Sequence, residues 1–208
     1  MIKGFVEMKQ LVIIGAGGHG KVVADIAKRN GYDRIVFLDD RSISACGDYS
    51  VVGKISDADS YHCDIFVAIG NAAIRRKVQE KLQSEGHDIP TLIHPNAVLG
   101  ESVKIGAGTV IMAGAVVNPC ASIGNGCIIN TGASVDHDCR ISDYVHVSVG
   151  SHVAGTVTVG ANTWIGIGVS ICNNIAICND CMIGAGAVVI KDIIESGTYI
   201  GVPARRIK

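Results

Sequence analysis

The chain has 208 residues, 48% of them hydrophobic, and a formal net charge of −1. This length suffices for one large domain or two small ones, each with a buried core. The near-neutral charge argues against nucleic acid as the main partner. No apolar run approaches the roughly 20 residues that span a bilayer, so we expect no membrane insertion. The segment 1–7 lacks the pattern of a signal peptide, which favours a cytoplasmic protein.

The first part of the chain alternates strand and helix patterns. Apolar runs predict strands at 10–14, 35–38 and 64–70, and helical patterns follow at 21–30 and 71–85. Such alternation is typical of a small parallel sheet with helices on its faces. We therefore assign residues 1–95 to an α/β, Rossmann-like domain.

A glycine-rich turn follows the first expected strand. Gly15, Gly17 and Gly20 match the G-x-G-x-x-G pattern, and Asp39 follows at about the spacing of a ribose-binding acid. Backbone N–H groups at the start of the next helix suit a diphosphate. The domain is too short for a complete dinucleotide-binding fold, so we expect a nucleotide-linked substrate rather than a redox cofactor. The alternative is that these glycines only permit tight packing between strand and helix.

The second part of the chain repeats every six residues. A branched aliphatic residue recurs at Leu99, Ile105, Ile111, Val117, Ile123, Ile129, Val135, Ile141, Val147, Val153, Val159, Ile165, Ile171, Ile177, Ile183 and Val189. This period fits neither an α-helix nor an alternating strand. It fits a short strand plus a corner, three of which close a triangular coil of roughly 18 residues. We therefore predict a parallel β-helix over 96–208, in which glycines after the aliphatic residues relieve the corners through positive φ.

Two histidines on the repeat avoid its inward positions. His137 stands between Asp136 and Asp138, and His146 comes nine residues later, half a coil away. The two imidazoles are therefore expected on opposite sides of one prism. They share a site only if neighbouring subunits each contribute one, which favours a homotrimer. Trp164 should lie one coil beyond His146, directly beside it.

The chain contains eight cysteines. In a cytoplasmic protein we expect them reduced. Cys127, Cys139 and Cys181 fall on the small inner positions of the repeat, which argues for a role in the wall rather than as nucleophiles. Cys178 and Cys181 form a lone C-x-x-C without a second pair at zinc spacing, so we expect no metal site there.

Several motifs together resemble the sialic acid O-acetyltransferase (NeuD-like) family of hexapeptide-repeat sugar acetyltransferases. They are the G-A-G-G-H-G turn, F-L-D-D, A-I-G-N, V-D-H-D with H-V-S-V-G, and the closing G-V-P-A-R. The resemblance covers about residues 11–206. It implies a left-handed β-helix, acetyl-CoA as acyl donor and a homotrimer with active sites between subunits. The chain is most similar to members that acetylate the 4-amino group of a UDP-linked 4-amino-4,6-dideoxy sugar.

The resemblance also implies residue roles. His137 matches the general base, and Asp138 matches its acidic neighbour, where relatives often carry the longer glutamate. Substrate contacts match Gly17, Gly18, His19, Asp39, Asp40 and Gly70. Acetyl-CoA contacts match His146, Ile167 and Ala185, the last in place of a glycine.

The implied reaction is direct acyl transfer. A neutral imidazole takes a proton from the sugar amine, Asp138 stabilises the imidazolium, and a backbone N–H holds the oxyanion. Three alternatives remain: acetylation of a sialic acid hydroxyl or of a GDP-linked amino sugar, a γ-carbonic-anhydrase-like zinc enzyme, and a non-enzymatic scaffold. His146 and His152 fall on different faces of the repeat, which argues against a shared zinc ion.

Overall fold

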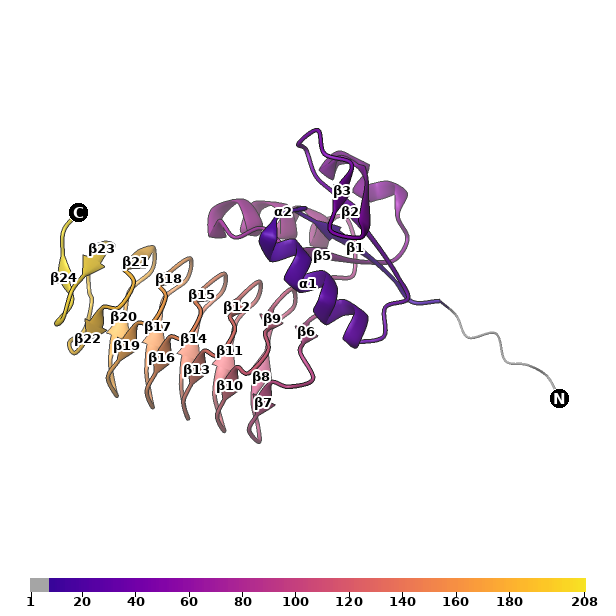
Figure 1. The fold of residues 1–208 in the computed structure, drawn as a ribbon. Coiled ribbons are helices and arrows are strands. Elements are labelled where there is room, and N and C mark those ends of the chain that lie inside the picture. The colour runs from indigo at the N-terminus through magenta and orange to yellow at the C-terminus, as the bar shows by residue number, and fades with distance from the viewer. Residues whose placement is uncertain (1–7) are drawn as a thin grey trace.

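The computed structural model describes residues 8–208, as an α/β domain followed by a long prism (Figure 1). The segment 1–7, which bears on the expected absence of a signal peptide, lies outside the described residues. Within 8–208, no helix is both long and apolar enough to cross a membrane.

The N-terminal domain has a five-stranded sheet in the order β3-β4-β2-β1-β5. Its elements are β1 (Gln10–Ile14), α1 (Gly18–Arg29), β2 (Arg34–Leu38), β3 (Ala45–Cys46), β4 (Tyr49–Gly53), the 3-10 helix η1 (Ile55–Ser60), β5 (Asp64–Val67) and α2 (Ala72–Ser84). The three expected strands pair in parallel, with β1 between β2 and β5. The β3–β4 hairpin and η1 were not anticipated from the sequence.

The central strand β1 explains why the domain has two apolar layers. Successive side chains of a strand point to opposite faces of the sheet. Leu11 and Ile13 accordingly pack in the cluster that contains α1 residues, whereas Val12 and Ile14 pack in the cluster that contains Leu82 of α2. A strand buried on both faces is apolar throughout, which is the pattern seen at 11–14.

The repeat forms a left-handed parallel β-helix of three sheets. Its strands are β6 (Leu92–Ile93), β7 (Val98–Leu99), β8 (Lys104–Ile105), β9 (Val110–Ile111), β10 (Val116–Val117), β11 (Ser122–Ile123), β12 (Ile128–Ile129), β13 (Ser134–Val135), β14 (Arg140–Ile141), β15 (His146–Val147), β16 (His152–Val153), β17 (Thr158–Val159), β18 (Trp164–Ile165), β19 (Ser170–Ile171), β20 (Ala176–Ile177), β21 (Cys181–Ile183) and β22 (Val188–Val189). From β6 to β19 each strand pairs in parallel with the third strand further on, as in Val117 with Val135, which confirms the predicted coil.

The three sheets give the prism three faces. The six-stranded face contains β7, β10, β13, β16, β19 and β22, and the five-stranded face contains β8, β11, β14, β17 and β20. The eight-stranded face contains β6, β9, β12, β15, β18 and β21 and ends in the hairpin of β23 (Gly197–Ile200) and β24 (Arg205–Arg206). This hairpin covers the last coil, because β23 pairs with β21.

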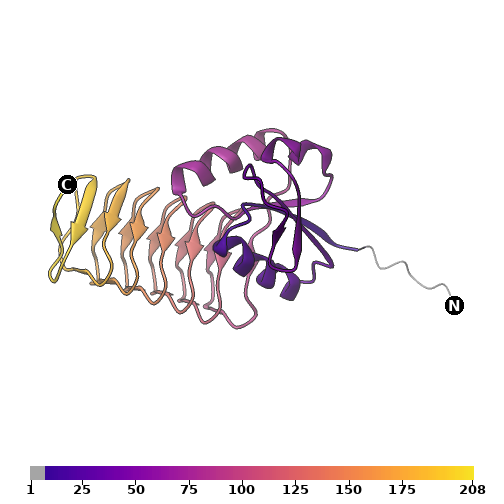
Figure 2. The ribbon, with the colours of Figure 1, turned by 45° about the horizontal axis from the view of Figure 1, so that its top comes forward.

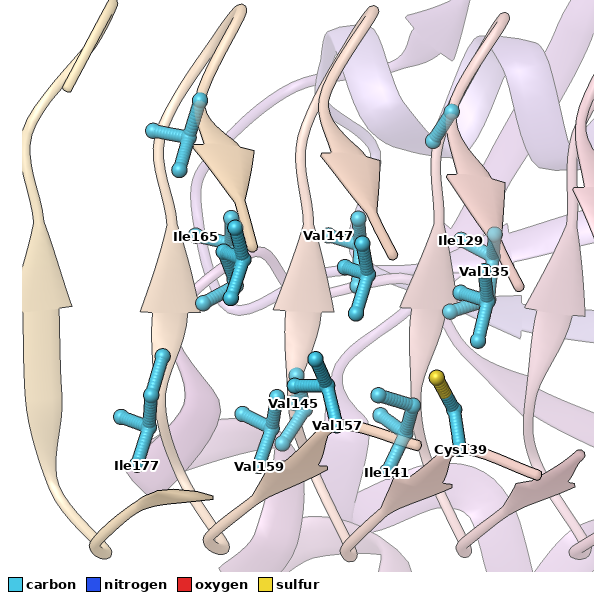
Figure 3. Packing of buried hydrophobic residues seen from close by; sticks show 14 of the residues in the cluster. Ile129, Val135, Cys139, Ile141, Val145, Val147, Val157, Val159, Ile165 and Ile177 are labelled. Atoms are coloured by element: carbon cyan, nitrogen blue, oxygen red, sulfur yellow. The ribbon is translucent and has the colours of Figure 1, made fainter. Parts of the chain in front are cut away.

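The predicted aliphatic residues from Ile111 to Val189 fill the prism (Figure 3), whereas Leu99, in the first coil, is exposed. Val135, Val147 and Ile165 are fully buried, and the small residues Cys127 and Cys139 complete the same cluster. The wall role predicted for these two cysteines is therefore confirmed.

The glycines that follow the aliphatic residues have a different role from the one predicted. Gly106 and Gly124 are not among the residues with positive φ. A Cβ atom on Gly124 would instead lie 2.7 Å from the backbone nitrogen of Asp143, one coil further on. These glycines therefore permit close stacking of neighbouring coils, and the left-handed corner positions belong to other residues, such as Gly108 and Gly126.

The N-terminal domain packs on the first half of the eight-stranded face (Figure 2). Val110, Met112 and Ile128 of this face join Val23 and Ala27 of α1 in one apolar cluster. Burial of such a shared cluster holds the two domains together through the hydrophobic effect.

Helix α2 crosses the corner between the five-stranded and eight-stranded faces. Two glycines at this corner, Gly108 and Gly126, make room for it. A Cβ atom on Gly108 would lie 2.2 Å from Oε1 of Gln79, and one on Gly126 would lie 2.4 Å from the Tyr144 ring. Gln79 is fully buried and donates to the carbonyl of Ala107 at 3.0 Å. The docking of α2 thus depends on glycine at this corner in two successive coils.

We predict that Gly126→Ala destabilises the protein more than a matched corner substitution does. Gly126 has φ of 59°, which costs an alanine about 1–2 kcal/mol, and the overlap with Tyr144 adds about 1–3 kcal/mol. Gly132 has φ of 64° with open space around it, so Gly132→Ala carries only the backbone cost. Denaturant unfolding of both variants measures the difference. Equal destabilisation would show that the overlap with the Tyr144 ring adds no cost.

Candidate active site

His137 lies at the corner between the six-stranded and five-stranded faces, where β13 gives way to β14. Its side chain is 55% exposed, and its Nδ1 lies 2.8 Å from Oδ2 of Asp138. The aspartate therefore reaches the imidazole although it is one methylene shorter than a glutamate. With Nδ1 donating to the carboxylate, Nε2 keeps a lone pair that can accept a proton.

The surroundings of His137 make it more basic and fix its backbone. The hydrogen bond to Asp138, together with the charges of Asp136 and Asp138, raises the pKa of His137. Asp136 accepts from the backbone N–H of His137 at 2.7 Å and from Nδ2 of Asn118, one coil earlier, also at 2.7 Å. A carboxylate held by two donors has a stable position, so the corner is well ordered around the histidine.

The imidazole of His137 lies against the next coil. A Cβ atom on Gly155 would be only 2.6 Å from Nε2 of His137. Glycine at this position therefore allows the ring to lie flat along the corner. A larger residue would push the ring away.

We predict that Asp138→Asn moves the pH profile of activity to lower pH and reduces its plateau. The neutral imidazole is the active form, so activity is lost as pH falls through the raised pKa of His137. Without the carboxylate this pKa falls toward its ordinary value, and the rising limb moves to lower pH. The imidazolium loses its stabilising partner, and we expect a plateau about tenfold lower. Initial rates from pH 5 to 9 test this; an unmoved limb would contradict it.

His146 lies on the eight-stranded face and points out of the prism, as predicted, but the N-terminal domain covers it. Nδ2 of Asn130 lies 3.0 Å from its Nε2, and its ring centroid lies 5.0 Å from that of Trp164. Strand pairing places Trp164 directly beside it, which confirms that expectation. Burial first, and then the charge of Arg75, lower the pKa of His146 to about 3. The imidazole is therefore neutral at physiological pH.

A pocket of about 310 Å³ joins the two domains beside His146. Gly70 and Asn71, at the start of α2, line one side, and His146, Trp164 and Met182 line the other. Gly70, which is expected to bind the substrate, and His146, which is expected to bind acetyl-CoA, thus line the same pocket. The sequence predicted neither the contact between Asn130 and His146 nor the pocket between the two domains.

The glycine turn lies at the amino end of α1. Gly17 caps this helix without a side-chain hydrogen bond, and Gly18 begins it. Unpaired N–H groups at such an end can bind an anion. Nε2 of His19 is buried without a hydrogen-bond partner among residues 8–208, and burial lowers the pKa of His19 to about 4.

The two predicted acidic contacts have partners within the domain. Asp39 accepts from the backbone N–H of Ala16 at 2.7 Å and forms an ion pair with Arg41 at 2.8 Å. These contacts hold the pKa of the Asp39 carboxyl well below its usual range. Asp40 accepts from the backbone N–H of Ile55 at 3.1 Å. Asp39 therefore braces the glycine turn, and its contact with a substrate stays a prediction.

Ile167 and Ala185 lie one coil apart at the corner between the eight-stranded and six-stranded faces. Both are exposed and flank the face that carries His146. His137 lies at the corner opposite this face. A single copy therefore groups the expected acetyl-CoA contacts together and keeps the expected base apart from them.

Possible metal ligands lie elsewhere. His146 is on the eight-stranded face and His152 on the six-stranded face, so they do not share an ion. Within residues 8–208, donor atoms within 4.8 Å of one another occur in Asp59, Glu85 and His87 on the N-terminal domain. His87 and Asp59 already pair at 3.2 Å, and we assign no ion to them.

The left-handed β-helix of six-residue repeats is the fold of hexapeptide-repeat acyltransferases. Residues 10–82 match the model of the PglD N-terminal domain. The acetyltransferase domain of PglB from Neisseria gonorrhoeae, solved with acetyl coenzyme A, is 40% identical and superposes with a TM-score of 0.94, covering 97% of this chain and 100% of that one. The chain belongs to this family of PglD- and PglB-type acetyltransferases.

Two further relatives bear on the acceptor. Perosamine N-acetyltransferase from Caulobacter crescentus, solved with CoA and GDP-perosamine, is 36% identical with a TM-score of 0.93, covering 97% of this chain and 98% of that one. UDP-N-acetylbacillosamine N-acetyltransferase of Bacillus subtilis is 39% identical over 113 residues. That match spans 51% of this chain and 52% of the relative, about half the length of each.

Proposed function

We propose that the protein transfers the acetyl group of acetyl-CoA to the amine of a nucleotide-linked sugar, with His137 as general base. The observation that carries the proposal is the exposed imidazole whose Nδ1 contacts Asp138 at 2.8 Å, which leaves the lone pair of Nε2 available to accept a proton. Relatives solved with acetyl coenzyme A, and with CoA and GDP-perosamine, support the same pair of substrates.

The residues suit direct attack of the amine on the thioester. The sugar arrives largely as an ammonium and loses one proton to solvent, which exposes its lone pair. As the nitrogen attacks the thioester carbonyl, Nε2 of His137 takes the second proton. The negative charge of Asp138 stabilises the imidazolium, and the tetrahedral intermediate collapses with release of the CoA thiolate. The buried cysteines of the wall take no part.

We infer that the active site lies between copies in a homotrimer. Within one copy, His137 lies opposite the face that bears His146, and Ile167 and Ala185 flank that face. A neighbouring prism can present its His137 corner to this face, and closed rings are a common symmetry of oligomers. Acetyl-CoA as donor also favours a location in the cytoplasm.

The acceptor is proposed to be the 4-amino group of a UDP-linked 4-amino-4,6-dideoxy sugar. The Bacillus subtilis relative supports a UDP-linked acceptor, and the complex with GDP-perosamine supports a GDP-linked one as second candidate. Release of free thiol from acetyl-CoA, measured against UDP- and GDP-linked 4-amino sugars and sialic acid, distinguishes them. We expect the UDP-linked amine to give the highest kcat/KM. Absence of thiol release with every amine would refute the proposal.

A further inference from the structure

Arg75 is a buried cation without an acidic partner. Its side chain is 1% exposed and is the largest of the fully buried side chains. No ion pair within residues 8–208 includes it. Buried charges are normally paired, because loss of hydration is costly. This arginine therefore requires a specific explanation.

The guanidinium group binds four backbone carbonyls from both domains. Nη1 donates to Ile69 and Gly70 of the N-terminal domain, each at 2.8 Å. Nε donates to Gly126 at 2.7 Å and Nη2 to Tyr144 at 2.9 Å, both on the prism. The planar fork of arginine can serve several acceptors in fixed directions, whereas a lysine ammonium has only three donors on a flexible stem.

Two of the carbonyls that Arg75 binds lie at or next to the pocket beside His146. Gly70 lines this pocket, and Tyr144 lies in the turn that leads into β15, two residues before His146. We propose that Arg75 is a positioning residue for acyl transfer, which fixes the turn at Gly70 against the coil that carries His146. The proposal rests on the proposed function of these two positions. Small displacements of binding groups reduce rates strongly, so such a fixed spacing is valuable.

The charge of Arg75 supports the same role. It adds to burial in lowering the pKa of His146 to about 3 and that of His19 to about 4. Both imidazoles therefore stay neutral, and Arg75 is the fixed cation next to them. A neutral residue in its place would remove the hydrogen bonds and the charge together, whereas lysine would keep the charge.

The alternative is that Arg75 only holds the domains together. A purely structural role would reduce the active fraction of the enzyme and leave the KM of the remainder unchanged. A positioning role raises the KM for the nucleotide sugar. Arg76→Met is the matched control, because Arg76 is the next residue of α2, is half-exposed and pairs with Glu80 on the surface at 2.8 Å.

The test compares Arg75→Met and Arg75→Lys with that control in the full chain. We expect the KM for the nucleotide sugar to rise about tenfold in Arg75→Lys and further in Arg75→Met, with little change in Arg76→Met. An unchanged KM with a reduced kcat in Arg75→Lys would overturn the proposal. Arg75→Lys keeps the charge and is the variant to use if Arg75→Met does not fold.

A second readout needs no substrate and so separates this proposal from the proposed function. The imidazole signal of His146, assigned by its loss in His146→Gln, can be titrated by NMR. We expect the pKa of His146 to stay low in Arg75→Lys and to rise in Arg75→Met. Hydrogen exchange at residues 69–75 should become faster in both variants. Unchanged exchange in both would refute the positioning role even in an active acetyltransferase.

Discussion

His137→Ala is expected to lower kcat by a factor of about 100 to 10,000 and to leave acetyl-CoA binding intact. General-base catalysis by a positioned side chain contributes a factor of this size. The imidazole is 55% exposed and contacts Asp138, so its removal leaves no cavity in the prism and no unpaired buried group. The prediction is checked by measuring thiol release, which should be slower by this factor, and the dissociation constant for coenzyme A, which should be unchanged.

Two other variants make this experiment specific. His152→Ala removes another exposed histidine, on the six-stranded face, and should retain full activity. Gly155→Val keeps His137 but displaces its ring, because even a Cβ atom at Gly155 would lie 2.6 Å from Nε2. We expect Gly155→Val to lose most of the activity as well. Undiminished activity in His137→Ala would remove this residue as the base.

The prism was predictable because one period determines it. The aliphatic residue of each hexad must be buried, and so must the residue that pairs with it one coil away. The sequence therefore shows the same requirement for an aliphatic residue many times. Val135, Val147 and Ile165 illustrate this: each is inward, buried and paired with its counterparts above and below. The handedness of the coil came only from the family resemblance.

The short elements of the N-terminal domain were not predictable from pattern. β3 has two residues, too few for any periodicity, and β4 has partly exposed residues throughout. The sheet nevertheless needs this hairpin, because β4 covers the edge of β2. Three-dimensional pairing, rather than local preference, decided these elements.

The packing of the domains was also invisible in the sequence. An arginine and a glutamine on a helix usually indicate a solvated face, yet Arg75 and Gln79 are buried against the prism. Only the structure shows that Gly108 and Gly126 leave space for the Gln79 side chain. The outward position of His137 was predictable from its place in the six-residue repeat, whereas the burial of His146 under the N-terminal domain was not.

We infer that two copies of the chain build one active site. The geometry behind it is the position of His137 on the corner opposite the face with His146. If the claim holds, each site in a ring of three combines the His137 of one copy with the His146 of the next. A ring in which all three copies carry the same substitution then has three defective sites. Copies of both kinds in one ring generate some sites in which both histidines are intact.

Mixed trimers of His137→Ala and His146→Gln test this claim most directly. Each parent should be nearly inactive when assayed alone. Random reassociation of equal amounts should restore activity to about a quarter of that of the unsubstituted protein. An intact site needs a His146→Gln copy that supplies His137 and a neighbouring His137→Ala copy that supplies His146, and about one site in four has this combination. Thiol release before and after mixing measures the gain. Activity that stays at the mean of the two parents would show that both histidines of one copy serve the same site, and would contradict the account.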